Sequence, residues 1–315
     1  MKPTTNPALE RDALYAKSQV YIRRGFRAQA DEDTEEYQLW ASLALELLGK
    51  AALAKVHPAL IADPNHSQSL FAACGRQLSP EIRTIAAHTL FERLSHIDKA
   101  FDSRHKKICE QMALRRNAEL HSGESPFSGM SPEAWEREFW GAVEVVLKMQ
   151  AESLESWLGA EDSKTPAQIL EQAEEAMQWA VKHRIERCKE DFTKKYQDPK
   201  QRAKILEDTK KFRYWEWPQF INMAGEGLDM AECPACTATG MRSGSLWNEE
   251  VSDEQDPEDP GTEWVDLTYV TEEFFCPTCG LRLFGTKEIE AGGLSEEYTK
   301  SEARGRDFGE EYGND

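Results

Sequence analysis

The sequence of 315 residues has no apolar run approaching the roughly 20 residues that a membrane-spanning helix needs. Its first segment, from Met1 to Arg24, mixes polar and charged residues and lacks the apolar core of a secretory signal. We therefore expect a cytoplasmic protein with no membrane partner.

Three common catalytic signatures are also absent. The chain has no phosphate-cradling glycine loop, no G-x-S-x-G elbow and no H-E-x-x-H helix, so ATP hydrolysis, serine hydrolysis and metalloprotease chemistry lack support. Cysteine is scarce, because seven residues in a chain of this length are too few for a disulfide-stapled secreted domain. Cys74, Cys109 and Cys188 stand alone in helical-looking sequence, and we interpret them as buried or inert thiols.

Charge is segregated along the chain. The formal net charge of −19 argues against a protein coated for non-specific nucleic-acid binding. Residues 182–214 nevertheless carry twelve Lys or Arg against six Asp or Glu, a net of +6. One interpretation is a solvated helix that pairs these bases with its own acids. The other is a phosphate-tracking face with four aromatic residues available for stacking on bases, namely Phe212, Tyr214, Trp215 and Trp217.

An acidic stretch follows further along. Residues 245–266 carry nine acids and no Lys or Arg. We interpret its centre, Glu249–Glu263, as a solvated insertion. The alternative is a loop that mimics nucleic acid and covers the basic stretch.

The first two-thirds of the chain has helical periodicity. Apolar residues from Trp40 to Ala51 recur at three- and four-residue steps, which predicts an amphipathic helix that ends before Pro58. A hydroxyl residue followed by proline predicts three further helix starts, at Ser79-Pro80, Ser131-Pro132 and Thr165-Pro166. The last of these helices is expected to break near Asp198-Pro199 and to resume to about Phe212.

Four cysteines form two short motifs, Cys233-Pro-Ala-Cys236 and Cys276-Pro-Thr-Cys279, separated by 39 residues. Two residues between thiols allow one tight turn to direct both sulfurs at one ion, and two such turns complete a tetrahedral four-sulfur shell. Gly280 suits the left-handed conformation that closes such a turn. We expect one structural Zn²⁺ per chain in a closed site, with a redox dithiol as the alternative.

This pattern resembles the zinc-ribbon family over roughly residues 230–288. The gap is longer than the roughly 15–20 residues usual in such motifs. We therefore treat the acidic segment within it as an insertion at the tip of a strand pair. Alternation such as Trp264–Val270 favours strands here.

A second constellation is Arg116-Asn117-Ala118-Glu119-Leu120-His121. On a helix, Asn117 and His121 share a face, and Arg116 lies one step round from Asn117. An imidazole can transfer protons near neutral pH, and a guanidinium can grip a phosphate in a fork. This set suits metal-independent RNA cleavage, in which the 2′-hydroxyl attacks its own phosphorus.

The motif resembles the R-x4–6-H signature of the HEPN superfamily of helical ribonucleases, over roughly residues 35–160. The resemblance implies a homodimer or higher even oligomer in which the motifs of two chains face one another and form one site. Cleavage of RNA at that site would leave 2′,3′-cyclic phosphate ends. Arg116 would bind the scissile phosphate, His121 would shuttle protons and Asn117 would support the site. Glu46, on the first long helix, falls where some relatives place an acidic residue that contacts the site.

Such proteins include toxins and anti-phage defence effectors, so RNA and an antitoxin or sensor protein are the expected partners. The first alternative is a non-catalytic adaptor, in which Arg116 and His121 only meet the dipole at a helix end. A redox-sensing regulator that uses the cysteines is a third class. The match Arg83–His88 has apolar intervening residues, and we interpret it as one turn of a packed helix.

The expected fold class is mainly α, a HEPN-like helical bundle followed by a small β-rich zinc ribbon. The expected parts are a lead segment 1–34, the bundle 35–160, a basic helical connector 161–218, the zinc ribbon with its acidic insertion 219–293, and a disordered tail 294–315.

Overall fold

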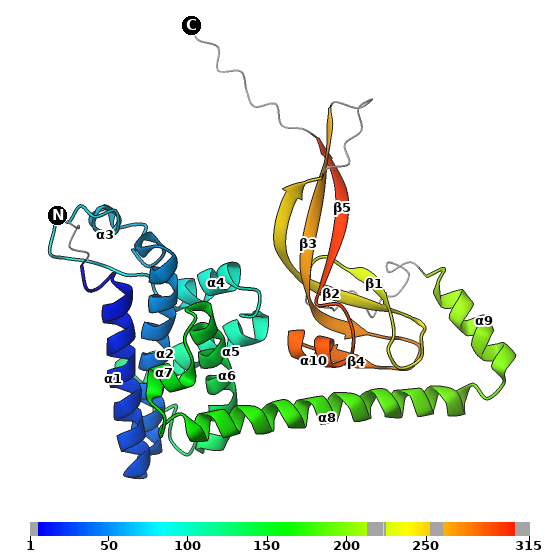
Figure 1. The fold of residues 1–315 in the computed structure, drawn as a ribbon, viewed down its shortest axis with the longest axis horizontal. Coiled ribbons are helices and arrows are strands. Elements are labelled where there is room, and N and C mark those ends of the chain that lie inside the picture. The colour runs from blue at the N-terminus through cyan, green and yellow to red at the C-terminus, as the bar shows by residue number, and fades with distance from the viewer. Residues whose placement is uncertain (1–5, 213–222, 224, 253–260, 306–315) are drawn as a thin grey trace, which may run out of the picture. The chain divides into compact units, whose positions relative to one another are not determined.

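The computed structural model describes residues 6–212, 223, 225–252 and 261–305, and the chain divides into two compact units, 1–175 and 176–315. The first unit is helical, and the second contains a five-stranded antiparallel sheet (Figure 1). The expectation of a mainly helical chain with a small C-terminal sheet is confirmed. The helices of the first unit are α1 (Arg11–Ala30), α2 (Thr34–Val56), α3 (Ser67–Ala73), α4 (Ala87–Ile97), α5 (Ser103–His121), α6 (Glu136–Met149) and α7 (Leu154–Leu158), with 3₁₀ turns at Pro58–Leu60 and Pro132–Ala134.

The helix α2 is the predicted amphipathic helix, and it lies in the core of the first unit. Asp33 caps its start by accepting a hydrogen bond from the Glu36 N–H at 2.9 Å. Its buried face includes Leu45 and Leu48, which share one apolar cluster with residues of α1, α4, α5 and α6. Its last residue, Val56, immediately precedes His57-Pro58, as the sequence predicts.

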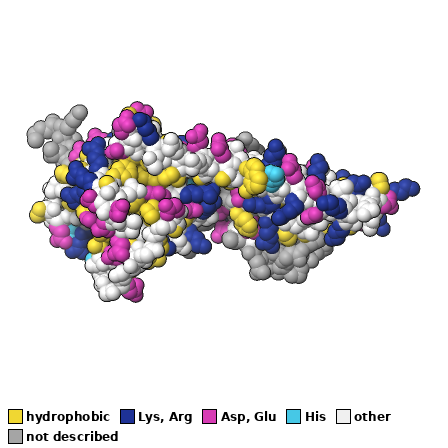
Figure 2. All heavy atoms as spheres, turned by 90° about the horizontal axis from the view of Figure 1, so that it is seen from below, with side chains coloured by type: hydrophobic (Ala, Val, Ile, Leu, Met, Phe, Trp, Pro, Cys, Tyr) yellow, Lys and Arg dark blue, Asp and Glu magenta, His cyan; other side chains and the backbone are white. Residues whose placement is uncertain are grey.

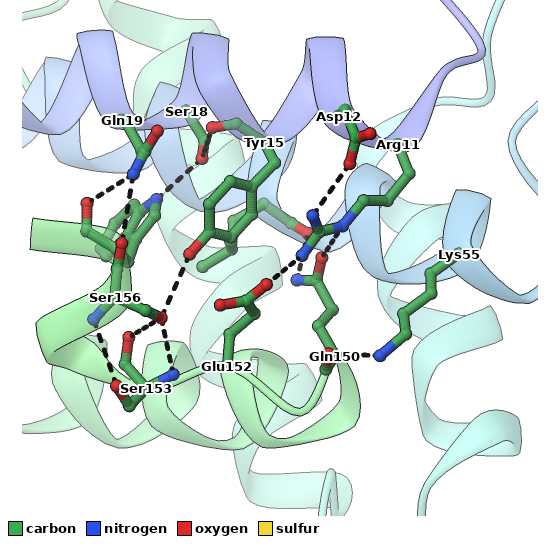
Figure 3. A network of polar contacts seen from close by, with 12 residues as sticks. Arg11, Asp12, Tyr15, Ser18, Gln19, Lys55, Gln150, Glu152, Ser153 and Ser156 are labelled. Atoms are coloured by element: carbon green, nitrogen blue, oxygen red, sulfur yellow. Dashed lines mark hydrogen bonds and ion pairs between the residues drawn. The ribbon is translucent and has the colours of Figure 1, made fainter.

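Residues 1–34 are not a separate lead segment, because α1 belongs to the same core. Leu14 and Ile22 are buried in the cluster that α2 forms. Polar contacts tie α1 to the α6–α7 connection (Figure 3). Arg11 Nη2 lies 2.6 Å from Glu152 Oε1, and Trp157 Nε1 donates to Ser18 Oγ at 2.8 Å.

One of the three predicted helix starts is wrong. Ser79-Pro80 does not begin a helix, because the backbone that follows pairs with an earlier segment instead. Asp63 N–H donates to Arg83 O and Ile85 N–H donates to Ile61 O, both at 3.0 Å, so residues 83–85 are extended. Ser131-Pro132 begins a 3₁₀ turn that leads into α6, and Thr165-Pro166 lies in the first turn of a long helix.

That long helix, α8 (Lys164–Lys195), contributes to both units, since the division falls between Glu175 and Ala176. It ends before Asp198-Pro199, and α9 (Pro199–Thr209) follows, as predicted. From the sequence we expected residues 161–218 to form a separate connector. The expected boundary between this connector and the zinc ribbon, near residue 219, lies outside the described residues. No helix in the described part of the chain is both long enough and apolar enough to cross a bilayer.

The sheet of the second unit has the order β1-β2-β3-β4, with β5 paired to β3 as well. Most of the long gap between the two cysteine motifs is the antiparallel pair β2–β3. Residues 249–251 and 262–263 of the acidic segment belong to these strands and not to a loop, and residues 253–260 lie outside the described range. The elements are β1 (Asp229–Glu232), β2 (Thr239–Val251), β3 (Thr262–Phe275), β4 (Arg282–Phe284), α10 (Thr286–Ala291) and β5 (Glu297–Gly305).

The strand β5 corrects the expectation of a disordered tail from residue 294. It pairs with β3 along its whole length, from Glu297 opposite Val270 to Gly305 opposite Thr262. Tyr298 stacks on Tyr269 with 5.4 Å between ring centroids. Composition hid this strand, because its other side chains are mostly exposed and polar.

Candidate metal centre and arginine–glutamate cluster

The two cysteine motifs form matching turns, one between β1 and β2 and one between β3 and β4. In each turn the N–H of the first cysteine donates to the carbonyl of the fifth residue after it. The N–H of the fourth residue donates back to the carbonyl of that cysteine. These bonds measure 2.8–2.9 Å, and they join Cys233 to Ala238 and Thr237, and Cys276 to Leu281 and Gly280.

In both turns, the residue whose N–H donates back to the first cysteine has a left-handed backbone conformation. Gly280 has φ +80°, which confirms the conformation expected of it. Thr237 occupies the equivalent position of the first turn with φ 58°. A β-branched residue rarely adopts this conformation, so the first turn imposes a backbone strain that the second avoids.

The four thiols converge on one point. Cys233 Sγ lies 3.6 Å from Cys279 Sγ, Cys236 Sγ lies 3.6 Å from Cys276 Sγ, and all four sulfurs are within 4.8 Å of one another. A tetrahedral ion with metal–sulfur bonds of about 2.3 Å places its ligands about 3.8 Å apart. The predicted four-cysteine cluster is therefore confirmed as a group that can hold a metal ion.

The four thiols shift one another's pKa values in opposite directions, lowering that of Cys276 and raising those of Cys233, Cys236 and Cys279. Hydrogen bonds from the other thiols, Cys233 first, lower the pKa of Cys276. Both motifs lie in β-turns, whereas a redox dithiol uses one pair at the start of a helix.

The metal centre is enclosed by an apolar cluster that includes part of α8. Val181, Cys188 and Phe192 of α8 are buried in the same cluster as the ligand cysteines. The Cys188 thiol is hydrogen-bonded to Cys279, and burial raises the pKa of Cys188. Cys188 is therefore a neighbour of the cluster that contacts Cys279 from α8.

A second polar cluster lies in the first unit. Arg116 of α5 is only 9% exposed, and its Nη1 forms an ion pair with Glu46 Oε2 of α2. Its Nε donates to Asn117 Oδ1 at 3.1 Å. The other oxygen of Glu46 lies 2.9 Å from Lys50 Nζ, which also donates to Thr84 Oγ1 at 3.0 Å.

The two cations keep Glu46 ionised. Burial by itself raises the pKa of Glu46, but attraction to Lys50 and then to Arg116, with their hydrogen bonds, lowers it below its usual range. Glu46 is therefore a carboxylate at neutral pH.

The histidine of the motif is the last residue of α5 and is exposed, as is Asn117. It makes no hydrogen bond or ion pair with another described residue. His121 lies five positions after Arg116, so the two side chains leave the helix about 140° apart. The structure thus brings Arg116, Asn117 and Glu46 together and leaves His121 at the open end of the helix.

Two leucines on α5 are unusually exposed. Leu114 is 67% exposed and Leu120 is 48% exposed. Leu114, Asn117 and His121 follow one another at three- and four-residue steps, so they share a face of the helix. Apolar side chains therefore flank the exposed polar residues of the motif.

The other R-x4-H match is not one turn of a helix, which corrects our interpretation of it. Arg83 lies in the extended segment and pairs with Glu81 at 2.6 Å. His88 lies on α4, and its Nδ1 is 2.7 Å from Glu110 Oε1.

Among the described residues of the basic stretch, Lys194, Lys210 and Lys211 each pair with an acid three or four residues away. Lys194 on α8 pairs with Glu190 at 3.2 Å, and Lys210, directly after α9, pairs with Glu207 at 3.5 Å. Figure 2 shows acidic and basic side chains interspersed over the face turned toward the viewer. These contacts favour the solvated helix. Three of the four aromatic residues considered for stacking, Tyr214, Trp215 and Trp217, lie outside the described residues.

Sequence reasoning missed two residues that the structure adds. Lys50 lies four residues after Glu46 on one helix, a spacing that could have identified it. Cys188 touches the metal cluster only through tertiary packing, and no local signal marks it. Comparisons with models of protein families, with curated proteins and with solved structures found no match to this chain.

Proposed function

We propose that the protein is a metal-independent endoribonuclease of HEPN type that acts as a dimer. The contact between Glu46 and Arg116 carries the proposal. The resemblance selected these two residues from positions 70 apart in the sequence, and the structure pairs them. Glu46 holds Nη1 and Asn117 holds Nε, so the N–H groups of Nη2 are the ones proposed to bind a phosphate.

The proposed chemistry needs only proton transfer and charge stabilisation. Arg116 binds the scissile phosphate and stabilises the charge that develops on it. His121 exchanges protons with the 2′-hydroxyl and the leaving oxygen, and its exposed position lets RNA reach it. Asn117 supports the guanidinium through its side-chain oxygen. The products are a 2′,3′-cyclic phosphate and a free 5′-hydroxyl.

A dimer completes the site. Because Arg116 and His121 leave α5 in different directions, one chain presents a phosphate-binding group and a proton-transfer group that do not converge. A second copy whose α5 faces the first supplies another imidazole opposite each guanidinium. Leu114 and Leu120, exposed on this helix, provide apolar surface for that contact.

We propose zinc as the ion held by the four cysteines, because four thiolates in a closed tetrahedron are its preferred structural site. The ribbon then serves as a rigid module for recognising RNA or a protein partner, such as an antitoxin or sensor, in a toxin or antiviral defence system.

The test is cleavage of total RNA in EDTA by the purified protein. Fragments with 2′,3′-cyclic ends that are lost with His121→Ala support the proposal. His88→Ala is a matched control, because His88 is the exposed histidine of the other R-x4-H match. Equal cleavage by wild type and His121→Ala contradicts the site.

The rival function is a non-catalytic adaptor that binds nucleic acid or protein. The burial of Arg116 and its pairing with Glu46 favour it, since a buried ion pair can serve structure alone. RNA binding without cleavage, at equal affinity in wild type and His121→Ala, selects this function.

A further inference from the structure

Lys50 is a buried lysine whose role the proposed chemistry does not state. It is 8% exposed, and lysines are almost never buried so deeply unless they are paired. Its ammonium group donates to Glu46 Oε1 on its own helix and to Thr84 Oγ1 in the extended segment before α4. An apolar side chain fills such a position without the cost of desolvating a charge, so packing alone does not explain this lysine.

The contacts of Glu46 are divided between two cations. Lys50 takes Oε1 and Arg116 takes Oε2, so the carboxylate is held at both ends and cannot rotate freely. Thr84 fixes Lys50 in turn from outside α2. The orientation of the Arg116 guanidinium is therefore set through a chain of contacts that begins at Thr84.

We infer that Lys50 is a positioning residue of the proposed ribonuclease site, which orients Glu46 toward Arg116 and offsets its negative charge. The inference rests on the proposed function.

The charge balance explains why a second cation is needed. Glu46 alone fixes Arg116 but also cancels its charge, which weakens the attraction for a phosphate. With Lys50, two cations share one carboxylate, and the cluster keeps one net positive charge in a poorly solvated place. Charges act more strongly there than in water, so the cluster both orients the guanidinium and attracts the scissile phosphate.

The decisive variants are Lys50→Met, which removes the charge, and Lys50→Arg, which restores it. With the RNA cleavage assay, we expect Lys50→Met to lower kcat by about 100-fold, the size of effect that a small misplacement of a catalytic group produces. KM changes less, and Lys50→Arg recovers most of the loss. Lys55→Met is the control, because Lys55 lies on the same helix but binds the carbonyl of Gln150.

The pH profile separates positioning from a general loss of stability. The charged groups that act on Glu46 are Lys50 from its own helix and Arg116 from α5. Without Lys50, burial opposes ionisation more effectively, so Glu46 takes up a proton at higher pH. The acidic limb of kcat then moves upward in Lys50→Met and returns in Lys50→Arg. If Lys50→Met does not fold, Lys50→Gln decides, since it keeps a donor and loses the charge.

A second measurement needs no activity. In a His121→Ala background, the titration of Glu46 is followed by carboxyl carbon NMR with and without Lys50→Met. An upward shift of its pKa shows that Lys50 holds Glu46 ionised. If the wild type nevertheless cleaves no RNA, the proposed function falls and the contact between Lys50 and Glu46 stands as a structural one. An unchanged titration, or an equal loss of kcat in Lys50→Met and Lys50→Arg, overturns the inference.

Discussion

The metal cluster and the arginine–glutamate cluster are both buried groups of polar side chains, but they are assembled in opposite ways. Four identical ligands come from two short turns, whose backbone bonds follow one pattern. The residues around Glu46 differ from one another and come from α2, α5 and the segment before α4. The first cluster is encoded locally and the second depends on tertiary packing.

The two clusters also differ in whether a ligand position or a charge is left without a partner. Four thiolates around one ion leave no ligand position open, which suits a structural role. The arginine–glutamate cluster keeps a net positive charge and adjoins exposed residues of α5. A closed cluster stabilises a fold, and an incompletely neutralised one can do chemistry on an anion.

Of the changes that distinguish the two clusters, removal of the metal should have the largest effect on stability. Structural zinc contributes about 10–16 kcal/mol of binding free energy to the folding of small zinc domains. We expect a strong chelator, or Cys276→Ser, to abolish hydrogen-exchange protection in β1–β4 while the amides of α2 and α5 stay protected.

Cys74→Ser is the control, because Cys74 is an exposed thiol of the first unit. Retained protection of the sheet after complete metal removal, verified by elemental analysis, would show that the sheet is held by its apolar core alone.

In the arginine–glutamate cluster, the free energy of unfolding should fall by different amounts when Glu46 or Arg116 is replaced. Glu46→Gln leaves two buried cations without a counter-charge and should cost about 3–5 kcal/mol in urea unfolding. Arg116→Met leaves Glu46 paired with Lys50, so its cost should be clearly smaller. Equal costs would mean that Lys50 does not compensate the carboxylate.

The cost of Glu46→Gln should also depend on pH. The pKa of Glu46 is lowered in the folded protein, so its contribution is fully present above the unfolded value of about 4.3 and is lost as pH falls through the lower folded value. The difference between wild type and Glu46→Gln should therefore be constant from pH 7 to about pH 5 and shrink below pH 4. Urea unfolding across this range measures it.

The sequence predicts well those features that short segments determine. Two cysteine motifs specify turn geometry within six residues each, so the cluster, its ligands and the left-handed Gly280 follow from spacing. The apolar stripe of α2 likewise predicts that helix without reference to the rest of the chain.

Features set by distant partners escaped prediction. Ser79-Pro80 has the local signature of a helix start, yet residues 83–85 pair with residues 61–63. The polar strand β5 exists because β3 offers an edge to it. Glu46 was identified only through a family resemblance, while Lys50, four residues later, was missed because a lysine is expected to be solvated.

The contact between Cys188 of α8 and the ligand Cys279 lets the contribution of α8 to the metal centre be measured. Groups that hold metal ligands from behind typically change affinity by about 10–100-fold when they are removed. We expect Cys188→Ala to weaken zinc binding within this range in a chelator competition, and Cys188→Ser, which keeps a hydrogen-bonding group, to weaken it less. Equal affinity in all three proteins would show that α8 contributes packing alone.

The smallest expected effect compares the two turns with each other. Thr237 and Gly280 occupy equivalent left-handed positions, but only glycine adopts that conformation without strain. Thr237→Gly should therefore stabilise the metal-loaded sheet by up to about 1 kcal/mol, because relief of the strain exceeds the added freedom of the unfolded chain. Gly280→Ala should destabilise it by about 1–2 kcal/mol for the converse reason. Thermal unfolding of the zinc-saturated protein measures both. A stabilising Gly280→Ala would mean that the two turns, despite their shared hydrogen bonds, carry their strain at different residues.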